Sequence, residues 1–308
     1  MFDLHFHSRA SDGQADFATV RTAVRAHPEL ALLALTDHDA IADSDRLARL
    51  EPRAWVGAEL TGFVGPTRVD ILGLNLRPDH PELLSHLATR SRARRERFAL
   101  FGLLLRQAGW IFEPEADTLA LPQLGLPHVA RELRRHPDNH RALREAGLAP
   151  DEASARSGDG HDAIYPLLLE PLDILVAERM TIGPAASVDL IGLVHRAGGL
   201  ALVAHPWIEP FDFGTADPEA ACAIIAVLAD AGLDGLERWH PDQVSAQAQW
   251  TITGLCRQYD LAESAGSDDH RVDLAALGSM SPGGYEGQQA LARLLEAARA
   301  RRLCPAVR

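Results

Sequence analysis

The sequence predicts an α/β barrel of seven strands that carries a smaller helical domain. Short apolar runs alternate with helix-like segments along the chain, which is typical of βα units built around a parallel sheet. Seven such runs are present, and seven units fit a closed barrel better than an open sheet. The chain has 308 residues, which is long enough for a barrel of roughly 250 residues and an insertion.

Each apolar run ends in, or contains, side chains that can bind metal ions. The first four runs are MFDLHFH (1–7), LALLALTDHD (30–39), RAWVGAEL (53–60) and TRVDILGL (67–74). The other three are GGLALVAHPW (198–207), LDGLERWH (233–240) and LAESAGSDDH (261–270). Because the carboxyl ends of parallel strands meet at one rim of a barrel, we expect these side chains to lie together there.

Helix-like segments separate the runs. They cover residues 14–27, 40–50, 184–197, 217–231, 241–259 and 286–302. Residues 79–180 break this alternation with a long helix that begins near Pro81 and several shorter helical pieces. We therefore predict that residues 1–78 and 181–308 form the barrel, and that residues 79–180 form a helical insertion over one side of its mouth.

Charge and composition limit the partners. The formal net charge of −13 opposes binding to long nucleic acids through their phosphates. No apolar run approaches the roughly 20 residues needed to cross a bilayer, and no leader-like segment precedes the first strand. We therefore expect a cytoplasmic protein that acts on a small anionic substrate, away from membranes and long nucleic acids. No pattern in the chain indicates its oligomeric state.

Two histidines near the start of the chain are the first candidate ligands. His5 and His7 are two residues apart on a predicted strand, so their side chains point the same way and can share an ion. Asp12 follows in a loop that Gly13 turns. Candidate ligands in the later runs are His38, Glu59, Asp70, His205, Asp268 and His270. Imidazole and carboxylate without thiolate suit Zn²⁺, Mn²⁺ or Fe²⁺ better than Ca²⁺, and a set of this size implies two or three ions.

Five of these segments resemble the motifs of a known family. DLHFHSRASDG, ALTDHD, GAEL, LVAHP and GSDDH are similar to motifs of the polymerase and histidinol phosphatase (PHP) family of metal-dependent phosphoesterases. The helical insertion between the fourth and fifth runs resembles the bacterial branch that includes nucleoside 3′,5′-bisphosphate phosphatases and 5′-to-3′ exoribonucleases. The resemblance implies a distorted (β/α)7 barrel with up to three metal ions at its mouth.

The resemblance also implies how the ligands are shared. One ion would take His5, His7, Glu59 and Asp268; a second would share Glu59 and use His205 with Asp70; a third would take Asp12, His38 and His270. The family usually has histidine where this chain has Asp70. A carboxylate there adds negative charge and should shift the preference toward Mn²⁺, Mg²⁺ or Fe²⁺ over Zn²⁺.

The insertion departs from the family as well. Relatives tend to have an Arg-Pro-His segment that holds the substrate phosphate, whereas GLPHVAREL has Leu126 in place of the arginine. We predict that His128 and Arg131 retain some contact with the anion. Arg94 and Arg97 share one helix face and either reach a second phosphate or form a solvated surface.

Three residues are predicted to take part in catalysis. His205 would act as a ligand at the reacting centre, Asp37 would orient an imidazole, and His240 would donate a proton to the leaving oxygen. The alternative for His240 is an ordinary polar strand end.

We expect a hydrolase that releases phosphate from a small phosphorylated molecule, foremost a nucleotide such as a nucleoside 3′,5′-bisphosphate. A metal-bridged hydroxide would be the nucleophile, with two or three divalent ions as cofactors, Mn²⁺ first and Zn²⁺ or Fe²⁺ as alternatives. One alternative is a 5′-to-3′ exoribonuclease or a cyclic phosphodiesterase on short nucleotides, for which base-stacking aromatic side chains would be needed. Another is a metal-binding regulatory module without activity.

Overall fold

The computed structural model describes residues 1–145, 164, 168–207 and 218–303. Seven strands form one sheet in the order β1-β2-β3-β6-β8-β9-β10. Their bounds are β1 Phe2–Asp3, β2 Leu32–Leu35, β3 Ala54–Leu60, β6 Ile71–Leu74, β8 Leu200–Val203, β9 Gly235–Trp239 and β10 Ala262–Ala265. Backbone hydrogen bonds join the two ends of the sheet, from Leu4 N to Ala265 O (2.9 Å) and from Asp268 N to His5 O (2.8 Å). The predicted seven-stranded barrel is confirmed.

One strand runs against the predicted direction. β6 pairs antiparallel with both β3 and β8, whereas the other neighbouring strands pair in parallel. The expectation of an all-parallel sheet was therefore wrong. The physical reason is the short hairpin before β6, formed by β4 Gly62–Val64 and β5 Thr67–Arg68, which returns the chain without a crossover helix. Asp70 lies just before β6, so the start of β6 reaches the rim where the parallel strands end.

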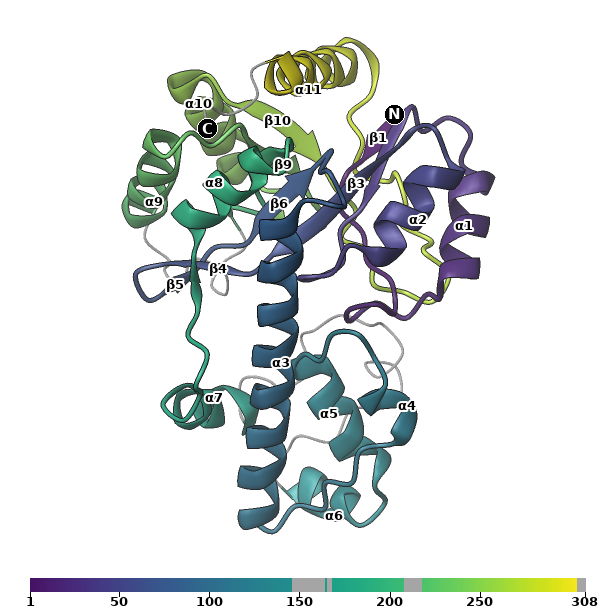
Figure 1. Ribbon diagram of the computed structural model, residues 1–308, viewed down its shortest axis with the longest axis vertical. Coiled ribbons are helices and arrows are strands. Elements are labelled where there is room, and N and C mark those ends of the chain that lie inside the picture. The colour runs from purple at the N-terminus through teal and green to yellow at the C-terminus, as the bar shows by residue number, and fades with distance from the viewer. Residues whose placement is uncertain (146–163, 165–167, 208–217, 304–308) are drawn as a thin grey trace.

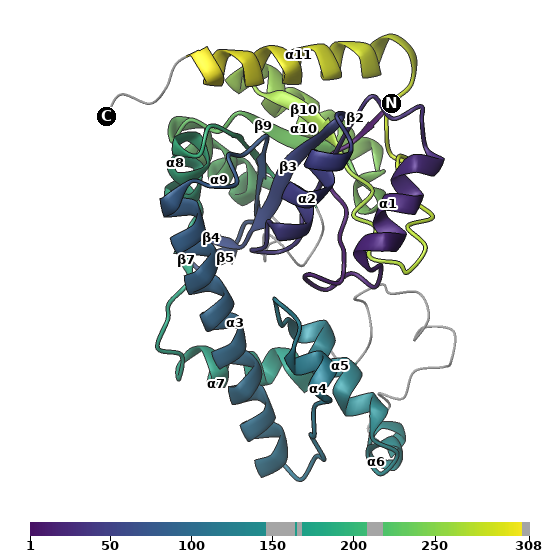
Figure 2. The same ribbon diagram turned by 45° about the vertical axis from the view of Figure 1, so that its right-hand side comes forward.

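Helices cover the outside and one end of the barrel. α1 Phe17–Ala26, α2 Ala42–Leu50, α8 Ser187–Arg196, α9 Pro218–Asp230 and α10 Ala246–Tyr259 pack around the strands (Figure 1). α11 Gly284–Leu303 lies across the end of the barrel that faces away from the insertion (Figures 1 and 2). Its Ala290 and Leu294 are buried against barrel residues that include Leu72 and Leu200. This end is therefore closed, and the opposite end is left for the site.

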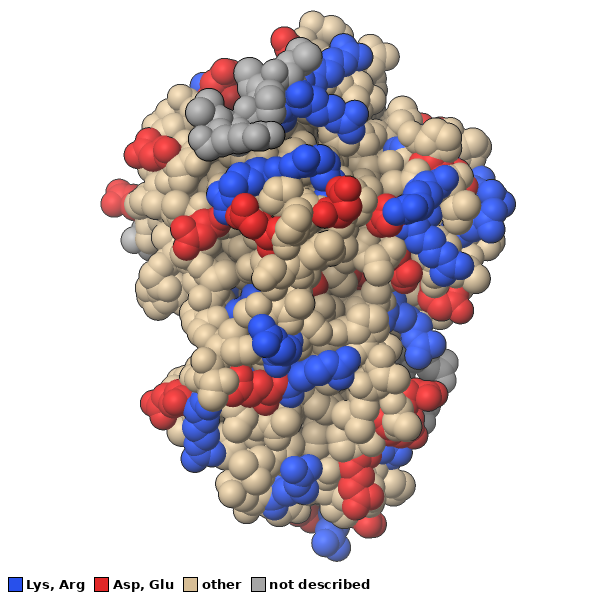
Figure 3. All heavy atoms as spheres, in the orientation of Figure 1, with Lys and Arg blue, Asp and Glu red and all other residues tan. Residues whose placement is uncertain are grey.

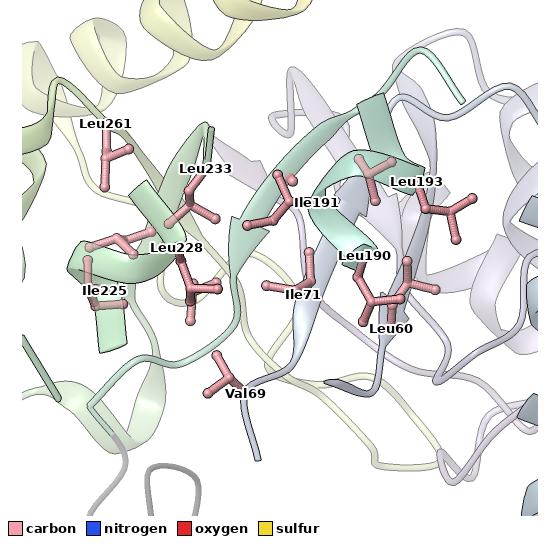
Figure 4. Packing of buried hydrophobic residues seen from close by; sticks show 14 of the residues in the cluster. Leu60, Val69, Ile71, Leu190, Ile191, Leu193, Ile225, Leu228, Leu233 and Leu261 are labelled. Atoms are coloured by element: carbon pink, nitrogen blue, oxygen red, sulfur yellow. The ribbon is translucent and has the colours of Figure 1, made fainter. Parts of the chain in front are cut away.

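The apolar layer between the barrel and its helices orients the start of β6. Val69 and Ile71 lie in the cluster with Leu190 and Leu228 of α8 and α9 (Figure 4). Because successive side chains in an extended chain point to opposite faces, Asp70 between them points inward, to the mouth of the barrel. Its backbone oxygen accepts a hydrogen bond from Ala204 N (3.1 Å), next to His205.

The helical insertion has a core of its own. Its helices are α3 Pro81–Gln107, α4 Ala116–Leu119, α5 Leu126–Arg135, α6 Asn139–Glu145 and α7 Glu170–Ala177 (Figure 2). Phe101, Leu105 and Leu133 are fully buried in this cluster. Leu83 and Leu87, near the start of α3, belong instead to the barrel cluster. Since α3 packs on both parts, the domain limits at 79 and 180 stay a prediction.

Within the described residues, the structure has no helix of the length and hydropathy required to cross a membrane. On the face drawn in Figure 3, arginine side chains alternate with groups of Asp and Glu.

Candidate metal centre

All nine predicted metal ligands meet at one rim of the barrel. Their donor atoms fall into four overlapping groups, and within each group the atoms lie within 4.8 Å of one another. The groups are His7, Asp12, His38 and His270; His5, Glu59 and His205; His5, His7 and Asp268; and His38, Glu59 and Asp70. The set is drawn from the ends of β1, β2, β3, β8 and β10 and from the start of β6.

The donor atoms around His5 and His7 are spaced as one ion requires. His5 Nε2 lies 3.1 Å from His7 Nε2, 3.3 Å from Glu59 Oε2 and 3.3 Å from Asp268 Oδ1. His7 Nε2 lies 3.3 Å from the same Glu59 oxygen and 3.1 Å from the same Asp268 oxygen. Bonds of about 2.1 Å at tetrahedral to octahedral angles place neighbouring ligand atoms about 3.0–3.4 Å apart. These four residues therefore fit a divalent ion.

A second group surrounds Asp12. Its carboxylate lies 3.5 Å from His38 Nε2 and 3.3 Å from His270 Nε2. Asp12 Oδ1 and His38 Nδ1 are buried and make no hydrogen bond to any residue that the structure describes. Groups of complementary charge lie nearby: His7 Nδ1 is 3.7 Å from the Asp12 oxygen, and Glu59 Oε2 is 3.1 Å from the His38 nitrogen. Such atoms are usually satisfied by water or an ion. A cation between Asp12, His38 Nε2 and His270 would satisfy the Asp12 oxygen, so this group also fits a metal, whereas His38 Nδ1 faces Glu59 Oε2.

The backbone is constrained at two ligands. His205 has φ 29° and Asp268 has φ 47°, both in the left-handed region, which residues other than glycine adopt uncommonly and Asn, Asp and His more often than the rest. Strained conformations of this kind persist where the surrounding structure holds them, and they gather at functional sites. His205 also brings Nε2 to 3.2 Å from Glu59 Oε1, so the two oxygens of Glu59 face different histidines, and this carboxylate would be shared if two ions bound.

Buried side chains behind the ligands hold them in position. His5 Nδ1 lies 3.1 Å from both oxygens of Glu237, and because a carboxylate only accepts, Nδ1 carries the proton and Nε2 is left to face the cluster. Glu237 also accepts from His205 N (2.8 Å). His240 Nδ1 accepts from Asp242 N, so its Nε2–H points to Asp268 Oδ2 at 3.3 Å. The predicted role of His240 as a proton donor stays a prediction.

Asp37 supports the loop that carries Asp12. Its carboxylate accepts from Ser8 N (2.8 Å), Ser8 Oγ (2.7 Å) and Ser11 Oγ (2.7 Å). All three residues are buried. These contacts position the loop between His7 and Asp12, and they give Asp37 a positioning role behind the rim.

Burial and charge set the protonation of the cluster. Burial disfavours the imidazolium form, but the carboxylates of Glu237, Asp268 and Glu59 outweigh it and raise the pKa of His5 to about 10. The pKa of His270 rises to about 10 because Asp268 and Asp12 outweigh its burial. Burial lowers the pKa of His38 to about 4. The neighbouring imidazoles hold the pKa of Asp12, Glu59 and Asp268 well below the usual range despite their burial.

Asp70 is engaged by an arginine. Arg68 Nε donates to Asp70 Oδ1 at 3.2 Å and its Nη2 contacts Oδ2, so the guanidinium covers both carboxylate oxygens. Asp70 groups with His38 and Glu59, whereas His205 groups with His5 and Glu59. The predicted second ligand set of Glu59, His205 and Asp70 stays a prediction.

The predicted substrate-binding residues belong to the insertion. His128 is buried near the start of α5, and its Nδ1 accepts from Gly125 N (2.9 Å). Burial lowers the pKa of His128 to about 4, although the negative charge of Asp12 opposes this shift. Arg131 is exposed on the same helix, and Arg9 of the first loop is among the charges that act on it.

The two arginines of α3 are already paired. Arg94 Nε donates to Asp39 Oδ2 (2.8 Å) and its Nη2 to Thr61 Oγ1 (2.9 Å), which ties α3 to the barrel. Arg97 donates to both oxygens of Asp173, at 3.0 and 2.6 Å, which ties α3 to α7. A substrate phosphate would have to compete with these carboxylates, so we regard both arginines foremost as positioning residues.

The sequence interpretation missed Ser8, Ser11 and Arg68. The serines gave no signal, because a serine beside a ligand motif is common. Arg68 did give one: it lies two residues before Asp70, so in an extended chain the two side chains share a face.

Comparisons with known proteins agree with this geometry. A structure described as an amidohydrolase from Chromobacterium violaceum, with bound sulfate and no metal, aligns with a TM-score of 0.66 over 95% of this chain and 96% of that chain, at 25% identity. A structure from Bifidobacterium adolescentis aligns with a TM-score of 0.64 over 95% and 96% at 23% identity, which shows the shared fold. A 3′,5′-nucleoside bisphosphate phosphatase of C. violaceum is 30% identical over 66% of each chain. This chain belongs to the PHP family of metal-dependent phosphoesterases.

Other PHP relatives differ in their named activities. A 5′-3′ exoribonuclease of Haemophilus influenzae is 29% identical over 87% of this chain and 89% of its own length. A phosphoribosyl 1,2-cyclic phosphate 1,2-diphosphodiesterase of Eggerthella lenta is 28% identical over 87% and 93%. No family model matches the chain. All these named activities are hydrolytic and act on phosphate esters, so this chain is a hydrolase, and the ligand cluster indicates divalent metals as its cofactors.

Proposed function

We propose that this chain is a phosphatase that removes a terminal phosphate from a small nucleotide such as a nucleoside 3′,5′-bisphosphate. The observation that carries the proposal is the rim cluster, in which imidazole and carboxylate atoms have the spacing of metal ligands. Divalent ions bound there supply a nucleophile from water and stabilise the charge that develops on the phosphoryl oxygens. The relative named as a 3′,5′-nucleoside bisphosphate phosphatase supports the substrate class.

Residues of this chain would supply the remaining steps. His128 and Arg131 would hold a phosphate on the side of the barrel mouth that the helical insertion covers. His240 holds Nε2 beside Asp268, within the rim, and in its doubly protonated form it would donate a proton to the leaving oxygen. Mn²⁺ is the ion we expect, since the described donor groups of the rim combine carboxylates with imidazoles and include no thiolate.

A second candidate activity is 5′-to-3′ cleavage of short RNA, because two relatives are named as such exoribonucleases. Base stacking on exposed aromatic side chains would be expected for it. Phe98, Phe101 and Phe112 are instead buried in the core of the insertion, and Trp110 packs against that core. Because these described aromatic side chains of the helical insertion are not exposed for base stacking, they favour a small substrate over RNA.

The test is phosphate release with Mn²⁺ from adenosine 3′,5′-bisphosphate, AMP and a short 5′-phosphorylated oligoribonucleotide. We expect kcat/KM for the bisphosphate to exceed that for AMP at least tenfold, since a second phosphate adds a charge-assisted contact of about 1.5–3 kcal/mol. Release of mononucleotides from the oligomer without activity on the bisphosphate would favour the exoribonuclease. His5→Ala should abolish all activity, whereas His27→Ala, at a surface pair with Glu29, should not.

A further inference from the structure

The start of β6 carries a charge arrangement that the ligand set alone does not explain. Asp70 is almost fully buried, with 1% of its side chain exposed, and its carboxylate belongs to a group of donor atoms with His38 and Glu59. Both of its oxygens are nevertheless contacted by the Arg68 guanidinium, whose side chain is 38% exposed. The Arg68 guanidinium is therefore a positive charge that the protein itself places beside this group.

The hairpin before β6 fixes that cation in place. Arg68 ends β5 and pairs with Phe63 of β4, and β4 in turn pairs with β7 Ala185–Ala186. The side chain of Arg68 extends from this three-stranded sheet to Asp70 two residues away. The planar fork of a guanidinium is preorganised and matches a carboxylate, so little entropy is lost per hydrogen bond formed.

The negative charge of the rim makes the Arg68–Asp70 ion pair relevant to metal binding. Glu59 is buried, Asp12 and Asp268 are 14% and 23% exposed, and all three carboxylates lie within the cluster, to which Asp70 adds a fourth negative charge. Pairing with Arg68 cancels that charge. An ion that approached Asp70 would have to share the carboxylate with the guanidinium and would meet its positive charge at short range.

We propose that Arg68 competes with a metal ion for Asp70, so that the subsite formed by His38, Glu59 and Asp70 is the weakest of the cluster and the guanidinium supplies its positive charge. Arg68 is thus a positioning and charge-balancing residue that sets how many ions the chain retains. This inference rests on the proposal that the rim binds divalent metals.

The test compares the wild-type chain with Arg68→Gln after removal of metals by chelation. Equilibrium dialysis against Mn²⁺, read by elemental analysis, gives the number of ions per chain and their affinities. We expect Arg68→Gln to bind its weakest ion about tenfold more tightly than wild type, the size of a typical coupling between two sites. The double variant Arg68→Gln with Asp70→Asn, which also removes the negative charge of the carboxylate, should not show this tighter binding of the weakest ion.

A stability measurement separates this effect from damage to the fold. Without metal, Arg68→Gln removes the guanidinium from a buried carboxylate, so its melting temperature should fall; added Mn²⁺ should raise it more than in wild type. Arg301→Gln is the matched control, because Arg301 donates to Asp234 Oδ1 at 3.1 and 2.6 Å outside the ligand cluster. It should lower the melting temperature without changing Mn²⁺ binding. Arg68→Lys, which keeps the charge with fewer contacts, should give an intermediate affinity.

The outcomes are distinguishable. If Arg68→Gln binds Mn²⁺ as wild type does, or loses an ion, Arg68 does not compete for Asp70 and the inference is overturned. If neither chain binds Mn²⁺ at the rim, the proposed function itself fails.

Discussion

Single residues divide the rim into ligands and the side chains that hold them. His5 faces the cluster with Nε2 because Glu237 holds its Nδ1, and Asp12 reaches His38 and His270 because Asp37 holds the loop before it. The two ends of one eleven-residue motif therefore serve different parts of the cluster.

His5→Ala and Asp12→Ala should remove different metal ions. His5 belongs to the group with His7, Glu59 and Asp268, whereas Asp12 belongs to the group with His38 and His270. Elemental analysis after dialysis should show each variant with fewer ions than wild type, and the double variant with fewer than either. The prediction fails if the double variant loses no more metal than one single variant.

The ligand residues could be predicted from the sequence because each follows or begins an apolar run. Their imidazole and carboxylate groups are also the side chains that bind divalent metal ions. The contacts that support them could not be predicted. Glu237 and His5 are 232 residues apart, and no local pattern brings them together. Leu126 and Asp70 could be recognised as departures from the family, but only the structure shows that Asp70 is paired with Arg68.

Among the secondary-structure elements, the segment after β10 shows how closely the barrel packs at its mouth. A Cβ at Gly266 would lie 2.1 Å from Glu237 Oε1 and 2.2 Å from His5 Cβ, closer than any real contact. A glycine at position 266 therefore leaves the room that the side chains of His5 and Glu237 need. The direction of β6 was harder to predict, since alternation of apolar residues is the same for parallel and antiparallel strands.

Gly266→Ala should displace His5 and Glu237 and weaken metal binding as well as folding. We expect a loss of about 2–4 kcal/mol in the free energy of unfolding, in the upper range for overpacked sites. Denaturant unfolding and Mn²⁺ titration would measure the two effects. Gly254→Ala in α10 is the control, because a Cβ there would meet no described atom within 4 Å beyond the helix's own backbone. It should be neutral or stabilise by up to about 1 kcal/mol without changing Mn²⁺ affinity.

For the whole molecule, protons and metal ions are competing occupants of the same cluster. Burial opposes the charged forms, but the carboxylates prevail and raise the pKa of His5 and His270 to about 10 and that of His7 to about 9. Without metal, imidazolium groups therefore balance the carboxylates at neutral pH. The same nitrogens must lose a proton before they bind an ion.

The metal-free protein should therefore become less stable as the pH rises. A histidine whose folded pKa lies above its unfolded value of about 6.5 stabilises the fold fully below pH 6.5, and this contribution is lost through about pH 9–10. Melting temperatures in chelator should fall over that window, while Mn²⁺ affinity should rise with proton release. A flat melting profile in chelator between pH 6.5 and 9 would contradict the prediction.

The reversed strand also decides how the lid is mounted. Because β6 begins at the mouth, it delivers the chain to the closed end of the barrel, and α3 must travel back along the wall before it reaches the insertion (Figures 1 and 2). Its 27 residues span about 40 Å at 1.5 Å per residue. The helix is fixed to the barrel beside Leu83 and again by Arg94, which donates to Asp39 and Thr61, so the part beyond Arg94 carries the insertion. Substitutions in that distal part of α3 would change how the insertion is held without touching any of the predicted metal ligands.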